Sequence, residues 1–409
     1  MTRDLIVAVV PALLMVNSQF AAAQWTQLAG GPEGHLVSSL ASNHQTLFVG
    51  TAGPGNPFFF VSTNQGGNWH IPDSTIMAVN SVVIGRSGIF AGTGGSGIYR
   101  STDQGLNWVD ADSGLTYASV DVIVTNGVSL FAGTSGGGVF RSTDQGTSWS
   151  EADTGLTHPT ITSMTLSGTY AFAGTYAGGV FVSSDNGAAW MPANDGLTQS
   201  TINDLVTCGT DVFAGTGSGV FRTTTNGSHW VQMNSGLTDT IVTVLGAVGA
   251  QVFAGTQSGV FLSTDGGGSW TDVSSGLPQN SPVLSLAFDS TYVYTGLYYG
   301  GVWRRLLSEM ITSVAASVSE LPHNISLSQN YPNPFNPTTA VSYQLSAVSE
   351  VKLVVYDMLG REVTVLVNEK KGPGRYEVQF DASRLASGVY CYRLISGSYV
   401  ETRKMILMR

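Results

Sequence analysis

Short segments in which apolar and polar residues alternate, separated by glycine-rich junctions, recur along most of the chain. The stretch from Ile161 to Ala193 shows one such unit. Its alternation predicts an inner strand at Ile161–Leu166, further strands at Tyr170–Thr175 and Gly179–Ser183, and an outer strand at Ala189–Ala193. A period of two along a strand indicates a sheet with one face buried, and glycine marks the turns between strands. We therefore expect an all-β protein.

An eight-residue motif, S-T-D-x-G-x-x-W, recurs six times, with successive starts 39, 41, 41, 40 and 40 residues apart. A period near 40 residues built from short strands is typical of β-propeller blades. Each motif falls between the third and outer strands, where the Asp can accept backbone N–H bonds, the Gly can adopt positive φ and the Trp can be buried. The residues predicted to build these turns are Asp103, Gly105, Trp108, Asp144, Gly146, Trp149, Asp185, Gly187, Trp190, Asp265, Gly267 and Trp270. Asn64 and Thr225 replace the Asp in two motifs, and we expect fewer hydrogen bonds in those turns.

A seventh unit, Pro282–Leu306, supplies three strands and then lacks the motif. Near the N-terminus, Trp25-Thr26-Gln27-Leu28 resembles Trp270-Thr271-Asp272-Val273. An N-terminal strand that completes the last blade would close the ring and remove its open sheet edges. The sequence thus predicts a seven-bladed β-propeller over residues 24–307.

A different pattern follows a linker at residues 308–325. A proline-rich segment, Ser328–Thr339, precedes short alternating segments. We expect a small Ig-like β-sandwich over residues 326–409. Its predicted strands are Ala340–Leu345, Val351–Asp357, Glu362–Val367, Arg375–Phe380, Gly388–Leu394 and Tyr399–Leu407.

The first 23 residues have the features of a signal peptide. Arg3 precedes an apolar stretch, Leu5–Val16, and Ala21-Ala22-Ala23 offers a cleavage site. The apolar stretch is shorter than the roughly 20 residues that span a bilayer. We expect passage through the periplasm and no transmembrane segment in the mature chain.

Charge differs between the two large segments. Residues 24–307 contain 17 Asp and Glu against six Arg, a net charge of −11, whereas residues 326–409 carry ten Lys and Arg against seven acids, a net charge of +3. The acidic segment would repel phosphate backbones, so nucleic-acid binding is not expected. The histidines of the predicted ring lack metal-ligand spacing, and no cofactor or metal is expected. Cys208 and Cys391 fall in different segments and form no disulfide framework.

The repeated motif resembles the Asp-box, or bacterial neuraminidase (BNR), repeat found in sialidases, xyloglucanases, sortilin-type domains and a photosystem II assembly factor family. The resemblance implies the fold rather than an activity, because this turn occurs in proteins with unrelated functions. Asn330–Thr339 (NYPNPFNPTT), Val355–Val363 (VYDMLGREV), Phe380–Leu394 (FDASRLASGVYCYRL) and the ending ETRKMILMR resemble the type A C-terminal sorting domain of the type IX secretion system. That resemblance implies that the secretion machinery is a partner of residues 326–409, and that the protein is secreted or held at the outer-membrane surface.

The charged residues of the ring do not suggest catalysis. A sialidase grips its anionic substrate with three arginines, but Arg100, Arg141, Arg222 and Arg304 recur in register and are predicted to be scaffold. A glycoside hydrolase needs two carboxylates. Acidic residues inside the motifs are assigned to structure, and the three less repetitive ones form no evident pair: Asp121, Asp204 and Asp239. We do not expect an enzyme, although a hydrolase of sialidase or xyloglucanase type stays an alternative.

A ligand is expected at the loops that join second to third strands and outer to inner strands, which share one face. Aromatic residues occur there with few charges, which suits a sugar or peptide ligand. The candidate ligand-binding residues are Tyr117, His158, Tyr176, Tyr298 and Tyr299. The favoured function is a secreted or cell-surface binding module for a glycan, peptide or protein. The further alternative is an envelope assembly or scaffold factor.

Overall fold

The computed structural model describes residues 24–53, 58–72, 76–311, 325–346, 348–372, 374–397 and 399–408. The predicted signal peptide lies outside the described residues, as does most of the predicted linker. The chain divides into two compact units, Met1–Ile311 and Thr312–Arg409. The first unit extends slightly beyond the predicted boundary at Leu307, because residues 307–311 form a helical turn on which Met310 is fully buried.

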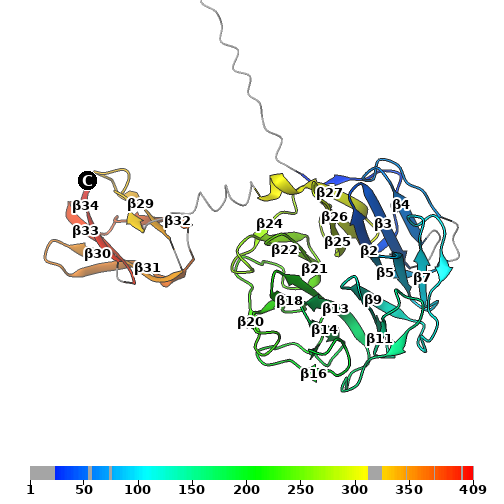
Figure 1. Ribbon diagram of the computed structural model, residues 1–409. Coiled ribbons are helices and arrows are strands. Elements are labelled where there is room, and N and C mark those ends of the chain that lie inside the picture. The colour runs from blue at the N-terminus through cyan, green and yellow to red at the C-terminus, as the bar shows by residue number, and fades with distance from the viewer. Residues whose placement is uncertain are drawn as a thin grey trace, which may run out of the picture. The chain divides into compact units, whose positions relative to one another are not determined.

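The first unit is built from antiparallel sheets arranged around a common centre (Figure 1). Among its described residues there are seven sheets, six with four strands and one with three. The inner strands are β2 (Leu36–Asn43), β5 (Val79–Gly85), β9 (Val120–Thr125), β13 (Ile161–Ser167), β17 (Asp204–Cys208), β21 (Val242–Val248) and β25 (Val283–Phe288). The second strands are β3 (Thr46–Ala52), β6 (Gly88–Thr93), β10 (Leu130–Thr134), β14 (Tyr170–Thr175), β18 (Asp211–Thr216), β22 (Gln251–Thr256) and β26 (Tyr292–Leu297).

The remaining strands lie toward the periphery. The third strands are β4 (Phe59–Ser62), β7 (Ile98–Ser101), β11 (Val139–Ser142), β15 (Val180–Ser183), β19 (Gly219–Thr223), β23 (Val260–Ser263) and β27 (Gly301–Leu306). The outer strands are β1 (Thr26–Gln27), β8 (Val109–Asp110), β12 (Ser150–Glu151), β16 (Met191–Pro192), β20 (Val231–Gln232) and β24 (Thr271–Asp272). Each outer strand is only two residues long. In the fourth unit the predicted strand Ala189–Ala193 is too long at its start, because the Trp190 N–H donates to the Thr154 carbonyl outside its own sheet (2.8 Å). At its end, the Ala193 N–H still donates to the Val180 carbonyl of β15 (2.8 Å).

Hydrophobic cores lie between neighbouring sheets rather than inside one of them. Phe90 and Ile98 of the second sheet, for example, pack with Val120, Phe140 and Trp149 of the third. The same arrangement recurs around the ring, including between the last sheet and the first. Burial of these side chains is the main force that holds adjacent sheets together.

The N-terminal strand closes the ring as the sequence predicted. β1 pairs antiparallel with β27 and completes the sheet β1-β27-β26-β25. Trp25 donates its backbone N–H to the Ser275 carbonyl (2.9 Å) and its indole N–H to the Val273 carbonyl (2.8 Å). Trp270 makes the equivalent indole bond to the Met233 carbonyl (2.8 Å). Trp25 thus occupies the place of a motif tryptophan although no motif precedes it.

A belt of polar side chains joins the inner strands to one another. At most junctions a hydroxyl or amide on, or just before, one inner strand donates to a backbone carbonyl on, or just before, the next. The last strand is joined to the first in this way, since Ser285 donates to the Val37 carbonyl (3.0 Å). The other bonds of the belt run from Ser38 to Val79, Asn80 to Val120, Thr162 to Ile202, Asn203 to Val242 and Thr243 to Val283.

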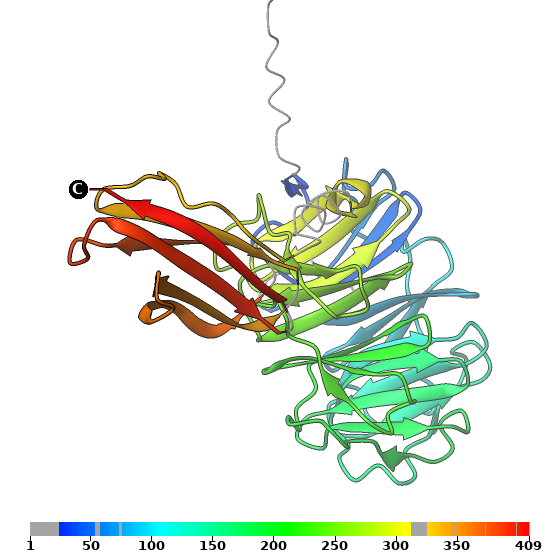
Figure 2. The same cartoon turned by 90° about the vertical axis from the view of Figure 1, so that its left-hand side faces the viewer.

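The second unit consists of two sheets that enclose one core (Figure 2). The sheet orders are β28-β29-β32 and β31-β30-β33-β34. The bounds are β28 (Ser326–Leu327), β29 (Thr338–Leu345), β30 (Ser349–Asp357), β31 (Glu362–Lys371), β32 (Gly374–Asp381), β33 (Gly388–Ser396) and β34 (Tyr399–Leu407). All six predicted strands are present, and β28 was not predicted. Phe335 of the proline-rich segment is buried in the core beside Phe380, so this segment belongs to the folded unit.

Candidate binding site

The motif aspartates hold their own turns together. Asp103 Oδ1 accepts bonds from the Ser101 hydroxyl (2.8 Å) and the Asn107 N–H (2.9 Å). Gly105 has a φ of +84° and donates its N–H to the Ser101 hydroxyl (2.8 Å). Hydrogen bonds, chiefly those from Asn107, lower the pKa of Asp103 to about 2. Asp144, Asp185 and Asp265 accept the same pair of bonds, so these carboxylates are structural.

The two motifs without aspartate keep this pattern. Asn64 Oδ1 accepts from the Ser62 hydroxyl (3.0 Å) and the Asn68 N–H (2.8 Å), and one acceptor oxygen is enough for these two bonds. Asp103, Asp144 and Asp265 accept a further side-chain bond at Oδ2 that the Asn64 turn does not show, so this turn has fewer hydrogen bonds, as expected. Thr225 forms the corresponding contacts at longer distances, 3.2 Å and 3.3 Å.

The four arginines that recur in register stack on aromatic rings of the second strands. The guanidinium of Arg304 lies 4.6 Å from the ring centre of Tyr292. Arg222 also pairs with Asp211 (2.5 Å). These contacts place the recurring arginines in the scaffold, as predicted. The other three stacked pairs are Arg100 on Phe90, Arg141 on Phe131 and Arg222 on Phe213.

The five predicted ligand-binding residues lie on the expected loops, and all five are exposed. Tyr117 packs over a glycine loop, since a Cβ placed on Gly137 would lie 2.5 Å from the Tyr117 Cβ. His158 covers Gly178 in the same way. Tyr176 is 64% exposed. Tyr298 and Tyr299 are each 46% exposed and form an edge-to-face pair with ring centres 4.5 Å apart. Tyr117 and His158 therefore contribute to loop packing.

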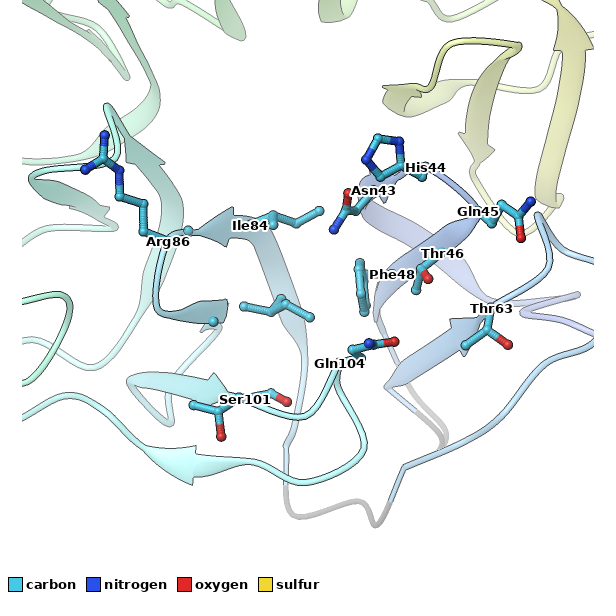
Figure 3. A pocket seen from close by; sticks show the side chains of 14 residues that line it. Asn43, His44, Gln45, Thr46, Phe48, Thr63, Ile84, Arg86, Ser101 and Gln104 are labelled. Atoms are coloured by element: carbon cyan, nitrogen blue, oxygen red, sulfur yellow. The ribbon is translucent and has the colours of Figure 1, made fainter.

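A groove of about 600 Å³ lies on the opposite face, between the first two sheets (Figure 3). Its floor contains Phe48, Ile84 and Ile89. Figure 3 shows Asn43 and Gln104 directed toward the centre of the groove, while Arg86 points away from it. Among the described residues that line the groove, none carries a carboxylate. The other polar side chains of the lining are His44, Gln45, Thr46, Thr63, Ser101 and Thr102.

The first sheet also differs from the second in its third strand. Val61 stands where Arg100 stands in the second sheet, because each precedes the serine of its motif. Arg100 stacks on Phe90 and valine offers no such contact, but Phe48, the ring opposite Val61, is still only 2% exposed. The fourth sheet has Val182 at this position, and a second cavity of about 420 Å³ lies beside that sheet. The sixth sheet has Leu262 at this position, so the residue type there does not by itself explain the cavities.

The central channel holds the two carboxylates that come nearest to a catalytic role. Its cavity of about 260 Å³ is lined by all seven inner strands and includes Asp121 and Asp204. Asp204 accepts bonds from the Ser163 hydroxyl (2.7 Å) and from the N–H groups of Leu205 (2.8 Å) and Leu245 (2.7 Å). Burial nevertheless raises the pKa of Asp204 to about 6. Asp239 is not part of this cavity and instead accepts bonds from Ser258 on the periphery (2.7 and 2.8 Å).

The stability of the ring is expected to respond to the ionisation of Asp204. Its folded-state pKa lies above the ordinary value of 3.8, so the folded chain holds this proton more tightly than the unfolded chain. The resulting stabilisation is complete below about pH 4 and is lost as the pH rises through about 6. We expect the melting temperature of the wild type to fall relative to that of Asp204→Asn between pH 4 and pH 7.

The control for this measurement is Asp110→Asn, on the exposed outer strand β8. Its melting curve should keep the pH dependence of the wild type. The readout is the slope of the melting temperature against pH. A loss of stability in Asp204→Asn that is the same at every pH therefore does not affect it. Parallel curves for the wild type and Asp204→Asn would contradict the prediction.

Within the described ranges, no group of three or more His, Cys, Asp or Glu side chains is placed to hold a metal ion. Nor does that part of the chain contain a helix long and apolar enough to cross a membrane. Cys208 and Cys391 are free thiols, one in each compact unit.

Comparison with known proteins identifies the C-terminal segment. Residues 329–408 match the family described as the secretion system C-terminal sorting domain. No curated protein sequence matches the chain. The match indicates secretion through the type IX system and an interaction with its machinery.

Solved structures resemble the chain in fold. PorZ from Porphyromonas gingivalis, a surface component of the type-IX secretion system, is 16% identical with a TM-score of 0.51; the match covers 92% of this chain and 60% of PorZ. YCF48 bound to D1 peptide is 16% identical with a TM-score of 0.55, covering 70% of this chain and 97% of YCF48. The WD40 β-propeller domain of Doa1 is 10% identical with a TM-score of 0.56, covering 70% of this chain and 99% of that domain. These likenesses confirm a β-propeller and, at such low identity, show the fold alone.

Proposed function

We propose that this protein is an exported, seven-bladed Asp-box propeller that binds a neutral glycan or peptide, joined to an Ig-like sorting sandwich. The groove between the first two sheets carries the proposal. It combines an apolar floor with a rim of amides and hydroxyls, as a sugar ring or an extended peptide requires. The net charge of −11 over residues 24–307 disfavours an anionic ligand.

Binding is favoured over hydrolysis by the placement of carboxylates. Glycoside hydrolysis needs an acid and a base or nucleophile on either side of the scissile bond. The described lining of the groove contains neither. In the channel, Asp204 is engaged by three donors, and Asp121 accepts from Asn80 and Ser135. A hydrolase acting in the channel stays the alternative, and turnover of fluorogenic glycosides that is lost in Asp204→Asn would establish it.

Removing the two amides at the centre of the groove is expected to weaken ligand binding. We expect the double variant Asn43→Ala with Gln104→Ala to lose about thirtyfold in affinity, because each of the two lost hydrogen bonds contributes about 1 kcal/mol. The ligand would be found by screening the mature chain against a glycan array and a peptide library. The YCF48 structure with a bound peptide is the reason for the second screen. Affinity would then be measured by titration calorimetry.

Two further variants decide which face binds. Thr169→Ala lies in the cavity beside the fourth sheet and should leave affinity unchanged. Tyr298→Ala with Tyr299→Ala removes the exposed aromatic pair from the other face. A loss of affinity in the tyrosine variant alone would move the site to the face predicted from the sequence. Lost capture of an envelope protein, with no glycan or peptide bound, would favour the assembly-factor alternative.

A further inference from the structure

Two large apolar side chains project from the turn between β30 and β31. Met358 is 67% exposed and Leu359 is 78% exposed. Neither belongs to the core of the second unit. A turn that served only to connect two strands would favour small or polar residues at its tip. Exposing two adjacent apolar side chains to water is unfavourable, which suggests that another surface covers them.

The turn is held rigid by the residues on either side of this pair. Asp357 Oδ1 accepts the N–H groups of Leu359 (2.9 Å) and Arg361 (3.0 Å), and Arg361 Nε donates to Asp357 Oδ2 (2.7 Å). The Gly360 N–H donates to the Asp357 carbonyl (3.0 Å), and Gly360 has a φ of +77°. The backbone at the tip is therefore fixed before any partner arrives. A preorganised tip loses little conformational entropy on docking.

We propose that the Met358–Leu359 tip is the element through which the sorting domain docks into an apolar pocket of the secretion machinery. The inference rests on the proposed export function, because the match over residues 329–408 is what identifies the machinery as the partner. Of the nitrogens in its guanidinium, Arg361 donates Nε to Asp357, and the side chain is 75% exposed. An acidic group at the rim of the pocket would complement this guanidinium.

The test follows export of the full chain in a host that has a type IX system. The double variant Met358→Ser with Leu359→Ser is expected to reduce the amount at the cell surface and in the medium by at least about tenfold, because two anchor residues are lost. The protein should accumulate in the periplasm. Its melting temperature should match the wild type, since both side chains are exposed. The exchange Met358→Leu with Leu359→Met keeps the tip apolar and should restore export.

A matched control is Val400→Ser on β34, where the side chain is also exposed, at 58%. It should be exported normally. Export of the Met358→Ser, Leu359→Ser chain at the wild-type level, while a chain that ends at Ile325 is retained, would overturn the docking proposal and leave sorting intact. An equal export defect in Val400→Ser would also overturn it.

Normal export of the truncated chain would instead contradict the sorting function itself. If the tip instead mediates self-association, the wild type would elute as a dimer on gel filtration. That result would count against docking of the tip into a pocket of the secretion machinery.

Discussion

A chain that ends at Ile325 is expected to stay in the periplasm, with its surface and medium fractions falling to background. The truncation removes all of the residues that match the sorting domain, 329–408, together with their separate core. The ring should remain folded, because the two compact units divide at Ile311 and Thr312 and each has its own buried residues. Cell fractionation with immunodetection measures the first result, and thermal unfolding of the retained protein measures the second.

A complementary experiment attaches residues 326–409 to an inert reporter that carries a signal peptide. The reporter should reach the surface or the medium in a host with a type IX system and should remain inside a host without one. If the truncated chain were released as well as the wild type, the C-terminal sandwich would not be an export address. A truncated chain that failed to fold would be recognised by its melting curve, and the reporter would then decide alone.

Loss of the N-terminal strand is expected to produce the largest loss of stability. Trp25 is 3% exposed and donates two hydrogen bonds to the neighbouring sheet. Replacing a buried tryptophan by alanine costs about 3–5 kcal/mol. For a ring of this size, that corresponds to a fall in melting temperature on the order of 10 °C. Deleting residues 24–29 should lower the melting temperature at least as much, because β27 then becomes an open edge.

Two variants calibrate that result. Trp270→Ala should cost about as much as Trp25→Ala, since Trp270 is 4% exposed and makes the equivalent indole bond. Met191→Ala on β16 should change little, since its side chain is 63% exposed. Closure by the N-terminal strand would be refuted by an unchanged melting temperature in Trp25→Ala or in the deletion.

The ring could be predicted from the sequence because its turns are local. The bonds of Asp103 join residues two and four positions away, so the motif that encodes the turn can be read within eight residues. The N-terminal strand was also recognisable, because Trp25 and the residues after it repeat the pattern at Trp270. In the second unit, β34 has the predicted bounds of Tyr399–Leu407, since alternation there is regular.

The groove was not predicted because its lining comes from two sheets. Asn43 and Arg86 lie far apart in the sequence and line one groove only when the first two sheets pack side by side. The role of Tyr117 and His158 in packing glycine loops depends on contacts between loops far apart along the chain. The aromatic residues of the exposed loops therefore predicted one face of the ring as the ligand-binding face. The residue type alone does not tell whether such a side chain contacts a ligand or packs against a neighbouring loop.

The pairing of β1 with β27 also sets the order in which the ring can fold. Thr26 pairs with Arg304, so nearly the whole propeller must be synthesised before this contact forms. Contacts between residues so distant in sequence carry a large loop-closure entropy and slow the folding transition. A chain interrupted before the last sheet would therefore keep an open edge. Because the sorting residues follow that last sheet, every chain that carries the export address also carries β27, the strand with which β1 pairs to close the ring.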